Sequence, residues 1–362
     1  MKQQVRYVAT GDGVQLAWAE LGRGPPLVKA ATWLTHLQHD LDSPVWAHWV
    51  RFLGEHFRYV RYDERGCGMS DWNAGELSLP RWVEDLESVV EAAGIDRPVA
   101  LLGISQGAAT AIRYAVRHPR RVSHLILYGG YAMGGLHGDD PERAALFRAV
   151  MDVVALGWGS DNPAFRRLFA ERFVPEGSAG QLAWFNELCR RTTSPENAAA
   201  LLQARGNIDV RDQLEQVRVP TLVLHANRDQ IAPLSQGRML ASRIPGARFV
   251  QLDSCNHVLL EHEPAWREFQ DAVLDFTGLA RRDPRADAGN ATRDEVLTAR
   301  ERAVLAQLCE GRSNAQIGWQ LGIAEKTVRN HVSALYRKLG VRSRAEAIVK
   351  VAGRRPSPAS TD

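Results

Sequence analysis

Residues 98–118 read Pro-Val-Ala-Leu-Leu-Gly-Ile-Ser-Gln-Gly-Ala-Ala-Thr-Ala-Ile-Arg-Tyr-Ala-Val-Arg-His. Pro98–Leu102 is an apolar run too short for a helix, which favours a buried strand, and apolar residues recur at helical spacing after Gly107. Between them lies Gly103-Ile104-Ser105-Gln106-Gly107, a G-x-S-x-G element. A sharp strand-to-helix turn of this kind presents a serine nucleophile and leaves no room for a Cβ at the glycines.

Short apolar runs alternate with helical segments on both sides of this element. The expected strands are Val5–Ala9, Val14–Ala19, Leu27–Ala31, Phe57–Tyr62, Val122–Tyr128, Val219–Ala226 and Ala247–Leu252. The expected helices include Trp33–Glu55, Leu79–Ala93, Leu234–Arg243 and Pro264–Gly278. This alternation predicts an α/β domain with a mostly parallel sheet covered on both faces.

The segment 131–212 interrupts this rhythm. It contains no expected strand, only helical stretches around 141–156, 163–173, 179–191 and 195–205. An all-helical insertion between two strands of such a sheet is expected to form a cap over the carboxyl ends of the strands.

Composition and charge are those of a soluble protein with one basic end. The first seven residues lack the apolar core of a signal peptide, and no apolar stretch is long enough to span a bilayer. The four cysteines are scattered, without metal-ligand or disulfide spacing. We therefore expect a cytoplasmic protein without a metal or cofactor. Residues 297–362 hold 12 Lys and Arg against 5 Asp and Glu, so a chain of net charge +3 has an acidic body and a basic end that suits a polyanion.

A serine hydroxyl is a weak nucleophile at neutral pH and needs a base oriented by a carboxylate. His257 is the one of the eleven histidines that follows the last expected strand directly, and Asp229 follows an earlier strand. Because the ends of parallel strands lie together, Ser105, Asp229 and His257 are predicted to form a catalytic triad. Asp253 is a minority alternative as the acid, since it lies close to His257 in sequence.

Residues 1–278 resemble the α/β-hydrolase family with a helical cap, which has the order Ser, Asp, His at strand ends. The segment Asp63-x-Arg65-Gly66-x-Gly68-x-Ser70-Asp71 is similar to the one after the family's fourth strand, where Arg65 and Asp71 are expected to pair within the turn. One departure is clear. The family commonly has His-Gly after its third strand, whereas this chain has Val28-Lys-Ala-Ala-Thr-Trp33. The backbone N–H groups of Gln106 and of Trp33 or Thr32 are the expected oxyanion donors.

Residues 279–296 are polar and aperiodic, as linkers are, and 353–362 read as a disordered tail. Between them, 297–352 predict four short helices, Thr298–Cys309, Asn314–Leu321, Glu325–Leu339 and Ser343–Val351. The tight corner at Leu321-Gly322-Ile323-Ala324 has the spacing of a helix-turn-helix.

This segment is similar to the LuxR-type helix-turn-helix, through Leu297-Thr-x-Arg-Glu301, Gly311-x-Ser-Asn314 and Glu325-Lys-Thr-Val328. The resemblance implies that the third helix enters the major groove of double-stranded DNA. It implies base contacts by Arg329, Asn330 and Ser333, and phosphate contacts by Ser313, Lys326, Thr327 and Lys338. The fourth helix corresponds to the family's dimer contact, so a homodimer is expected.

Two functions remain open from the sequence. The leading one is a transcriptional regulator whose α/β-hydrolase domain binds, and in one version hydrolyses, a small-molecule signal under the cap. The alternative is an active serine hydrolase of the esterase or C–C hydrolase type, in which regulation is secondary.

Overall fold

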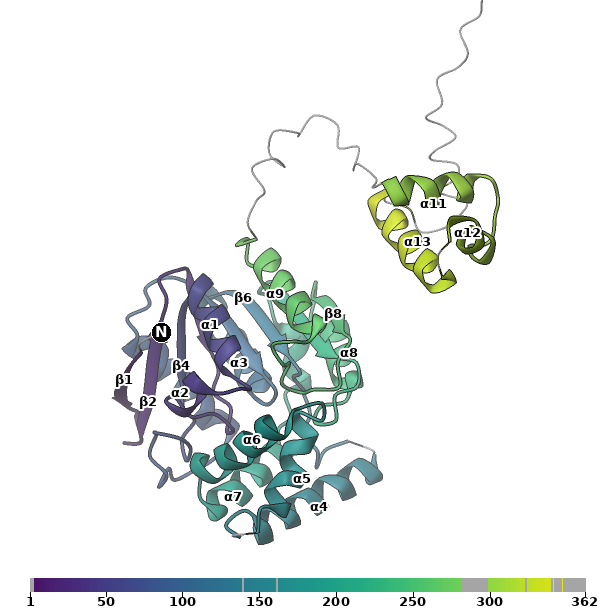
Figure 1. Cartoon of the computed structure of the whole chain (residues 1–362). Coiled ribbons are helices and arrows are strands. Elements are labelled where there is room, and N and C mark those ends of the chain that lie inside the picture. The colour runs from purple at the N-terminus through teal and green to yellow at the C-terminus, as the bar shows by residue number, and fades with distance from the viewer. Residues whose placement is uncertain are drawn as a thin grey trace, which may run out of the picture. The chain divides into compact units, whose positions relative to one another are not determined.

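The computed structural model describes residues 3–138, 140–160, 162–280, 299–322, 324–339, 341 and 347. The chain divides into two compact units, Met1–Ala280 and Arg281–Asp362 (Figure 1). Most of the expected linker, the expected fourth helix apart from Ala347, and the expected tail lie outside the described residues.

An eight-stranded sheet forms the centre of the N-terminal unit, in the order β1-β2-β4-β3-β5-β6-β7-β8. Its strands are β1 (Gln4–Ala9), β2 (Gln15–Leu21), β3 (Pro26–Lys29), β4 (Arg58–Tyr62), β5 (Val99–Ile104), β6 (Val122–Tyr128), β7 (Thr221–Ala226) and β8 (Arg248–Leu252). The pairs β1–β2 and β2–β4 are antiparallel, and the other pairs are parallel. Every residue of β5 and β7 is buried, as in parallel strands covered on both faces.

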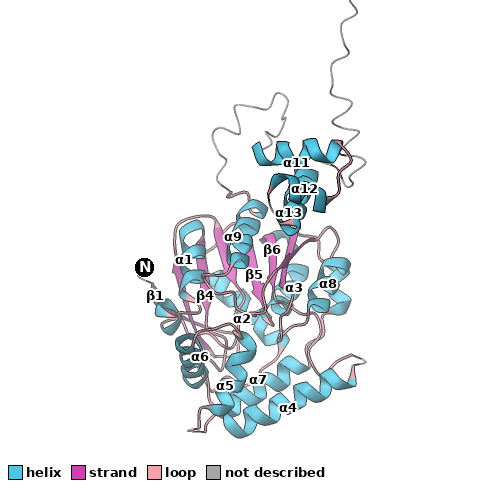
Figure 2. Cartoon of the chain, turned by 45° about the vertical axis from the view of Figure 1, so that its right-hand side comes forward, coloured by secondary structure: helices cyan, strands magenta, loops and turns pink. Residues whose placement is uncertain are grey.

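Helices cover both faces of this sheet (Figure 2). The crossover from β3 to β4 passes through α1 (Ala47–His56), and the one from β4 to β5 passes through α2 (Leu79–Ala92). These crossovers run in opposite directions along the sheet, so right-handed connections place α1 and α2 on opposite faces. The helix α9 (Pro264–Phe276) packs against α1 through Trp266 and Trp49, whose rings lie 4.7 Å apart. The remaining helices of the sheet are α3 (Gly107–Arg117) and α8 (Leu234–Arg243).

The expected helix Trp33–Glu55 is shorter in the structure and begins at Ala47. Before it the chain forms a loop with a 3-10 turn at His39–Asp42. The hydroxyl of Ser43 accepts the backbone N–H groups of Val45 (3.0 Å) and Trp46 (2.8 Å). This local turn, with Pro44 restricting the residue before it, ends the loop and starts the helix.

Four helices form the cap, α4 (Pro141–Gly157), α5 (Ala164–Phe173), α6 (Ala179–Thr192) and α7 (Pro195–Gly206). They gather at one end of the sheet, at the bottom of Figure 1. The order of the strands reverses between β3 and β5, so the loops after these two strands diverge and open a crevice under the cap.

Arg65 is a scaffold residue, although its partners differ from the expected one. Its guanidinium binds Asp85 at 2.6 Å and Asp12 at 2.9 Å. Asp71 instead accepts the backbone N–H of Gln15 at 2.8 Å. The expected pairing of Arg65 with Asp71 is therefore wrong, because Asp12 and Asp85, which are far from Arg65 in sequence, bind the buried guanidinium instead.

The C-terminal unit contains the helices α11 (Ala299–Cys309), α12 (Asn314–Leu321) and α13 (Glu325–Leu339). They share a small apolar core made of Val304, Leu305, Leu308, Ile317, Val328, Val332 and Leu335. Ser313 and Gln316 form a reciprocal capping box at the start of α12, and Gly322 ends that helix in the left-handed conformation with φ of +64°. Within the described residues of the chain, no helix combines the length and apolar character needed to cross a bilayer.

Candidate active site

Ser105 lies at the turn between β5 and α3 in a left-handed backbone conformation. Its φ is +53°, and no other described residue except glycine has a positive φ. This conformation costs an L-residue about 1–2 kcal/mol and occurs preferentially at functional sites. The Ser105 N–H donates to the carbonyl of Tyr128 at 3.0 Å, which ties the turn to the end of β6.

The two glycines of the G-x-S-x-G element lie where backbone atoms occupy the space that a Cβ needs. At Gly103, a Cβ would lie 2.7 Å from the Cα of Ala108. At Gly107, it would lie 3.1 Å from the carbonyl oxygen of Ala30 and 3.2 Å from that of Ala31. Backbone atoms cannot rotate away, so glycine permits the close packing of the turn against α3 and the loop after β3.

Asp229 and His257 are joined by a hydrogen bond between the loops after β7 and β8. His257 Nδ1 lies 2.7 Å from Asp229 Oδ2. The other carboxylate oxygen accepts the backbone N–H groups of Ile231 at 2.8 Å and Ala232 at 3.0 Å. Because an ionised carboxylate only accepts, Nδ1 carries the ring proton and Nε2 is free to act as a base.

The carboxyl of Asp229 is held in its ionised form. Burial alone would raise the pKa of Asp229, but the charge and the hydrogen bond of His257, together with the Ala232 N–H, outweigh burial and place the pKa below its ordinary value. Asp253, the alternative acid, is exposed and instead binds Arg228 at 2.8 Å and Asn227 at 3.0 Å. The structure thus brings Asp229, rather than Asp253, to the imidazole.

Ser105 and His257 line the same narrow cavity, together with Trp33 and Phe173. His257 Nε2 is buried and has no hydrogen-bond partner among the described residues. Leaving such an atom unsatisfied costs about 1–3 kcal/mol. No hydrogen bond joins Ser105 and His257 within the described part of the chain, and in ligand-free sites such bonds are often long. The unsatisfied nitrogen is suited to accept a proton from the serine hydroxyl.

The loop that stands where the family has His-Gly is fixed by side-chain hydrogen bonds. Lys29 Nζ donates to Thr32 Oγ1 at 3.1 Å, and Thr35 Oγ1 donates to the Thr32 carbonyl at 2.9 Å. Trp33 follows with its ring stacked on Trp158 at 5.3 Å. Gln106 is the N-cap residue of α3, so its backbone N–H lies at a helix N-terminus. Both predicted oxyanion donors therefore belong to residues that line the cavity beside Ser105.

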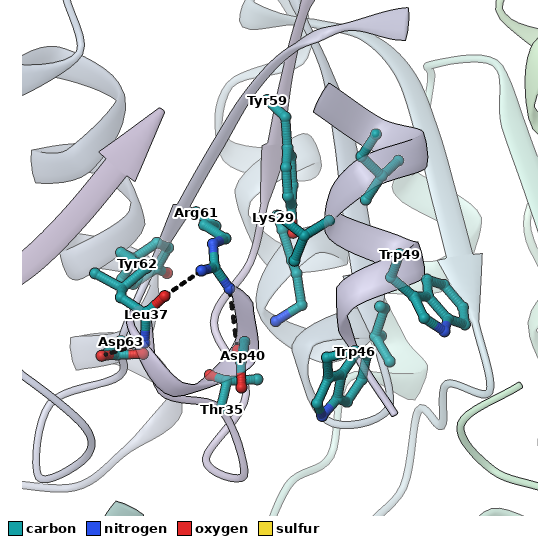
Figure 3. A pocket seen from close by; sticks show the side chains of 13 residues that line it. Lys29, Thr35, Leu37, Asp40, Trp46, Trp49, Tyr59, Arg61, Tyr62 and Asp63 are labelled. Carbon is teal, nitrogen blue, oxygen red and sulfur yellow. Dashed lines mark hydrogen bonds and ion pairs between the residues drawn. The ribbon is translucent and has the colours of Figure 1, made fainter. Parts of the chain in front are cut away.

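Lys29 belongs to a buried cluster of charged side chains that sequence reasoning missed (Figure 3). Arg61 donates to Asp40 at 3.0 Å, and both side chains are almost fully buried. Burial lowers the pKa of Lys29 to about 8, and burial raises the pKa of Asp40 and of Asp63 to about 6. The hydrogen bond from Lys29 to Thr32 joins this cluster to the loop after β3, which carries the predicted oxyanion donor Trp33.

A larger cavity of about 420 Å³ lies between the cap and the sheet and reaches Ser105, Gln106 and Asp229. This volume falls in the range of small-molecule sites. Its apolar walls come mainly from the cap, with Phe147 and Val150 on α4, Phe169 and Phe173 on α5, and Leu202 on α7. Trp33, in the loop after β3, also lines it.

The predicted DNA-contacting residues are the N-cap residue of α12, Ser313, and six residues of α13. The side chains of Thr327 and Arg329 are exposed, and Arg329 pairs with Glu325 on the same helix at 3.2 Å. Ser313 lies at the start of α12, where its hydroxyl accepts the Gln316 N–H at 3.3 Å. The side chains of Lys326, Asn330, Ser333 and Lys338 lie outside the described part of the structure.

Comparison with protein families matches the alpha/beta hydrolase fold over residues 36–264. The chain belongs to the α/β-hydrolase family. Residues 295–351 match the luxR family of bacterial regulatory proteins, so the C-terminal unit is a LuxR-type helix-turn-helix. The expected fold class, an α/β-hydrolase with a helical cap followed by an all-α helix-turn-helix, is confirmed.

Individual α/β-hydrolases resemble the N-terminal unit over most of their own length. An AB hydrolase superfamily protein of Bacillus subtilis is 26% identical over 263 residues, covering 69% of this chain and 91% of the relative. A 2-hydroxy-6-oxo-2,4-heptadienoate hydrolase of Pseudomonas putida is 27% identical over 299 residues, covering 75% and 95%. A hydrolase structure from Pseudomonas aeruginosa has a TM-score of 0.64 and 27% identity, covering 76% of this chain and 98% of that one.

Sequence reasoning on this α/β-hydrolase missed the arginines of the larger cavity, Arg143, Arg172 and Arg205. Each lies on a different cap helix, so no motif or spacing connects them. The only sequence signal was their place within the helical insertion that follows β6.

Proposed function

We propose that the protein is a DNA-binding transcriptional regulator whose α/β-hydrolase unit binds a small-molecule signal under its cap. One observation carries this proposal. A single chain combines a LuxR-type helix-turn-helix with a hydrolase unit whose cavity of about 420 Å³ reaches Ser105. A hydrolase that acts only as an enzyme has no need of a DNA-reading unit. A role on DNA also implies a cytoplasmic protein.

In this proposal α13 reads the major groove of double-stranded DNA. Arg329, Asn330 and Ser333 contact base edges, and Ser313, Lys326, Thr327 and Lys338 contact phosphates. The exposure of Thr327 and Arg329 supports these assignments. The chain acts as a homodimer, so the operator contains two half-sites about one helical turn apart.

The ligand regulates DNA binding by changing the equilibrium between two states of the protein. A coupling free energy of about 1–3 kcal/mol between the two sites is enough for a 5- to 150-fold change in affinity. Since Phe169 and Phe173 on α5 line the cavity, the cap is the part of the hydrolase unit that the ligand contacts most directly.

The test of DNA binding starts with selection of bound duplexes from a random library by the full chain, followed by gel shifts. Arg329→Ala is expected to weaken binding to the selected duplex and relax specificity at one base position by about 1–3 kcal/mol. Arg302→Ala removes the same charge from an exposed position on α11 and serves as the control. Failure of the wild-type chain to enrich any duplex would refute a regulator.

The second candidate function is an active serine hydrolase, of the esterase or C–C hydrolase type. The hydrogen bond of 2.7 Å between His257 and Asp229 favours it, because a receptor has no use for an oriented base. Ser105 Oγ attacks a carbonyl carbon while His257 Nε2 takes the hydroxyl proton, and Asp229 stabilises the resulting imidazolium. The N–H groups of Gln106 and Trp33 bind the oxyanion.

Treatment of the full chain with a fluorophosphonate, followed by measurement of the intact mass, separates the two functions. An activated nucleophile gives a mass increase in the wild type and none in Ser105→Ala. The absence of any increase in the wild type favours a receptor without turnover. A stable adduct with ester substrates would identify a third behaviour, a receptor that is acylated at Ser105 for the duration of the signal.

A further inference from the structure

We propose that the ligand under the cap is an organic carboxylate with an apolar body, and that the guanidinium groups of Arg143 and Arg172, which no carboxylate of the protein neutralises, attract its carboxylate group. This inference rests on the proposed function, since it takes the cavity of about 420 Å³ as the ligand site. It adds the chemical class of the ligand and the two residues that recognise it.

Each of these arginines is held by one backbone carbonyl and by no carboxylate. Arg143 on α4 donates from Nη2 to the carbonyl of Met133 at 3.1 Å. Arg172 on α5 donates from Nη2 to the carbonyl of Gln230 at 3.1 Å. Among the residues that the structure describes, no carboxylate oxygen lies within 4.0 Å of a guanidinium nitrogen of Arg143 or Arg172. A guanidinium has five N–H donors, so most of the donors on each side chain remain for a ligand.

Both arginines are partly buried, and neither guanidinium has gained a full counter-ion. Burial lowers the pKa of Arg143, and the nearby Asp140 carboxylate opposes this shift only in part. Burial likewise lowers the pKa of Arg172, against the charge of Asp229. A partly desolvated cation is stabilised by an anion that binds beside it, and a carboxylate matches the planar fork of arginine in a bidentate manner.

The acidic residues that line the cavity do not replace such a ligand. Asp229 is already bonded to His257 and to two backbone N–H groups. Asp140 is exposed and accepts the backbone N–H of Arg143 as the cap of α4, and Glu142 is exposed as well. These carboxylates are therefore committed to the fold or hydrated, and the two arginines remain the unmatched charges of the site.

The third arginine of the cavity, Arg205, has a carboxylate counter-ion, although its Nε and Nη1 atoms are buried without a hydrogen-bond partner among the described residues. Its Nη2 binds both oxygens of Glu64, at 2.7 and 2.8 Å. Its guanidinium carbon lies 4.9 Å from the ring centroid of Trp33 and 5.3 Å from that of Trp82. Arg205 thus ties α7 to the loop after β4 and is not assigned to the ligand.

The apolar body of the ligand fits the remaining walls. Phe147, Val150, Phe169, Phe173 and Leu202 surround the cavity with aromatic and aliphatic carbon. A positively charged ligand would leave the two guanidinium groups without a counter-ion. An acyl or arylalkyl chain that ends in a carboxylate supplies an anion for the arginines and an apolar body for the walls.

The test uses tryptophan fluorescence of the full chain, since Trp33 lines the cavity. The probes are two matched pairs, octanoate with octanamide and 4-phenylbutyrate with 4-phenylbutanamide. Within each pair only the charge of the head group differs. In the wild type, at least one acid is expected to bind about tenfold more tightly than its amide, the usual minimum for a hydrogen bond to a charged group.

The variant Arg143→Gln/Arg172→Gln is expected to lose this preference and to bind acid and amide with similar affinity. The control Arg148→Gln/Arg167→Gln removes the same number of charges from exposed positions on the same two helices and keeps the preference. Far-ultraviolet circular dichroism and urea midpoints establish that both double variants fold.

Three results would overturn the inference. They are equal affinities of acid and amide in the wild type, no saturable quenching by either acid, and a preference that persists in Arg143→Gln/Arg172→Gln. The gel shifts without ligand test the proposed function separately. A chain that prefers carboxylates but enriches no duplex would retain this site and lose its role as a regulator.

Discussion

The backbone N–H of His257 donates a hydrogen bond of 2.8 Å to the carbonyl of Phe173, the last residue of the cap helix α5. The rings of the two residues also meet edge to face, with centroids 5.4 Å apart. Beside this contact, the side chain of Asn256 accepts the backbone N–H of Glu176 at 3.0 Å. The loop that carries His257 and the end of α5 are therefore attached to each other, so we expect a displacement of α5 to move the imidazole as well.

Replacement of Asn256 by alanine is expected to loosen this attachment. The variant leaves the Glu176 N–H without its acceptor in a partly buried position, which costs about 1–3 kcal/mol. Hydrogen exchange is expected to accelerate in α5 and in the segment after it, and to stay unchanged in α3 on the sheet. Equal acceleration in α3 would mean that the contact stabilises the whole unit and does not specifically hold the cap.

The left-handed conformation of Ser105 predicts a difference between two substitutions that both remove the hydroxyl. Ser105→Gly relieves the backbone strain at φ of +53°, whereas Ser105→Ala retains it. We expect the glycine variant to be more stable than the alanine variant by about 1 kcal/mol, after the larger chain entropy of unfolded glycine is subtracted from the relief of strain. Urea denaturation of the two variants measures the difference. A more stable alanine variant would show that the turn is not strained.

The buried pair of Glu64 and Arg205 is expected to couple the cap to the sheet. Glu64→Leu or Arg205→Met alone leaves an uncompensated buried charge and is expected to destabilise the chain by about 3–5 kcal/mol. The double variant is expected to be less destabilised than the sum of the two, by about 1–3 kcal/mol. The exposed pair of Arg51 and Glu261 provides a control, since loss of such a pair changes stability by about 0–1 kcal/mol. Additive effects in the buried pair would contradict the coupling.

Lys29 predicts how stability depends on alkaline pH. Burial lowers its pKa to about 8 in the folded protein, against 10.5 in the unfolded chain. Between these values the unfolded chain binds more protons, so this lysine makes stability rise with pH. Relative to Lys29→Met, the wild type is expected to gain about 1–2 kcal/mol between pH 8 and 9.5. Because the other titrating groups are common to both proteins, a constant difference across this range would show that Lys29 keeps its ordinary pKa.

The sequence predicted most of the fold because the buried strands and amphipathic helices carry local patterns. Val122–Tyr128 and Leu234–Arg243, for example, form a strand and a helix with the expected bounds. The prediction that the helix extends before Ala47 was wrong. The apolar spacing through Trp46 and Trp49 does not reveal that hydrogen bonds to the Ser43 hydroxyl start the helix.

The candidate site likewise has a part that the sequence predicted and a part that it did not. Ser105, Asp229 and His257 each follow a strand, so topology alone brings them to one edge of the sheet, and their catalytic role stays a prediction. The salt bridge between Glu64 and Arg205 joins residues 141 positions apart. Arg143 and Arg172 are unmatched charges because the packed structure brings no carboxylate within ion-pair distance of them. Such features exist only in the packed structure and leave no pattern in the sequence.

The most direct test of the account is the affinity of the full chain for its selected duplex, with the cavity empty and with it filled. The cavity is filled by a phosphonate attached to Ser105 or, in a chain that does not react, by saturation with 4-phenylbutyrate. Fluorescence anisotropy is expected to give a change in the dissociation constant of 5-fold or more, corresponding to about 1–3 kcal/mol of coupling. Identical dissociation constants for the empty and the filled chain would contradict a ligand-gated regulator.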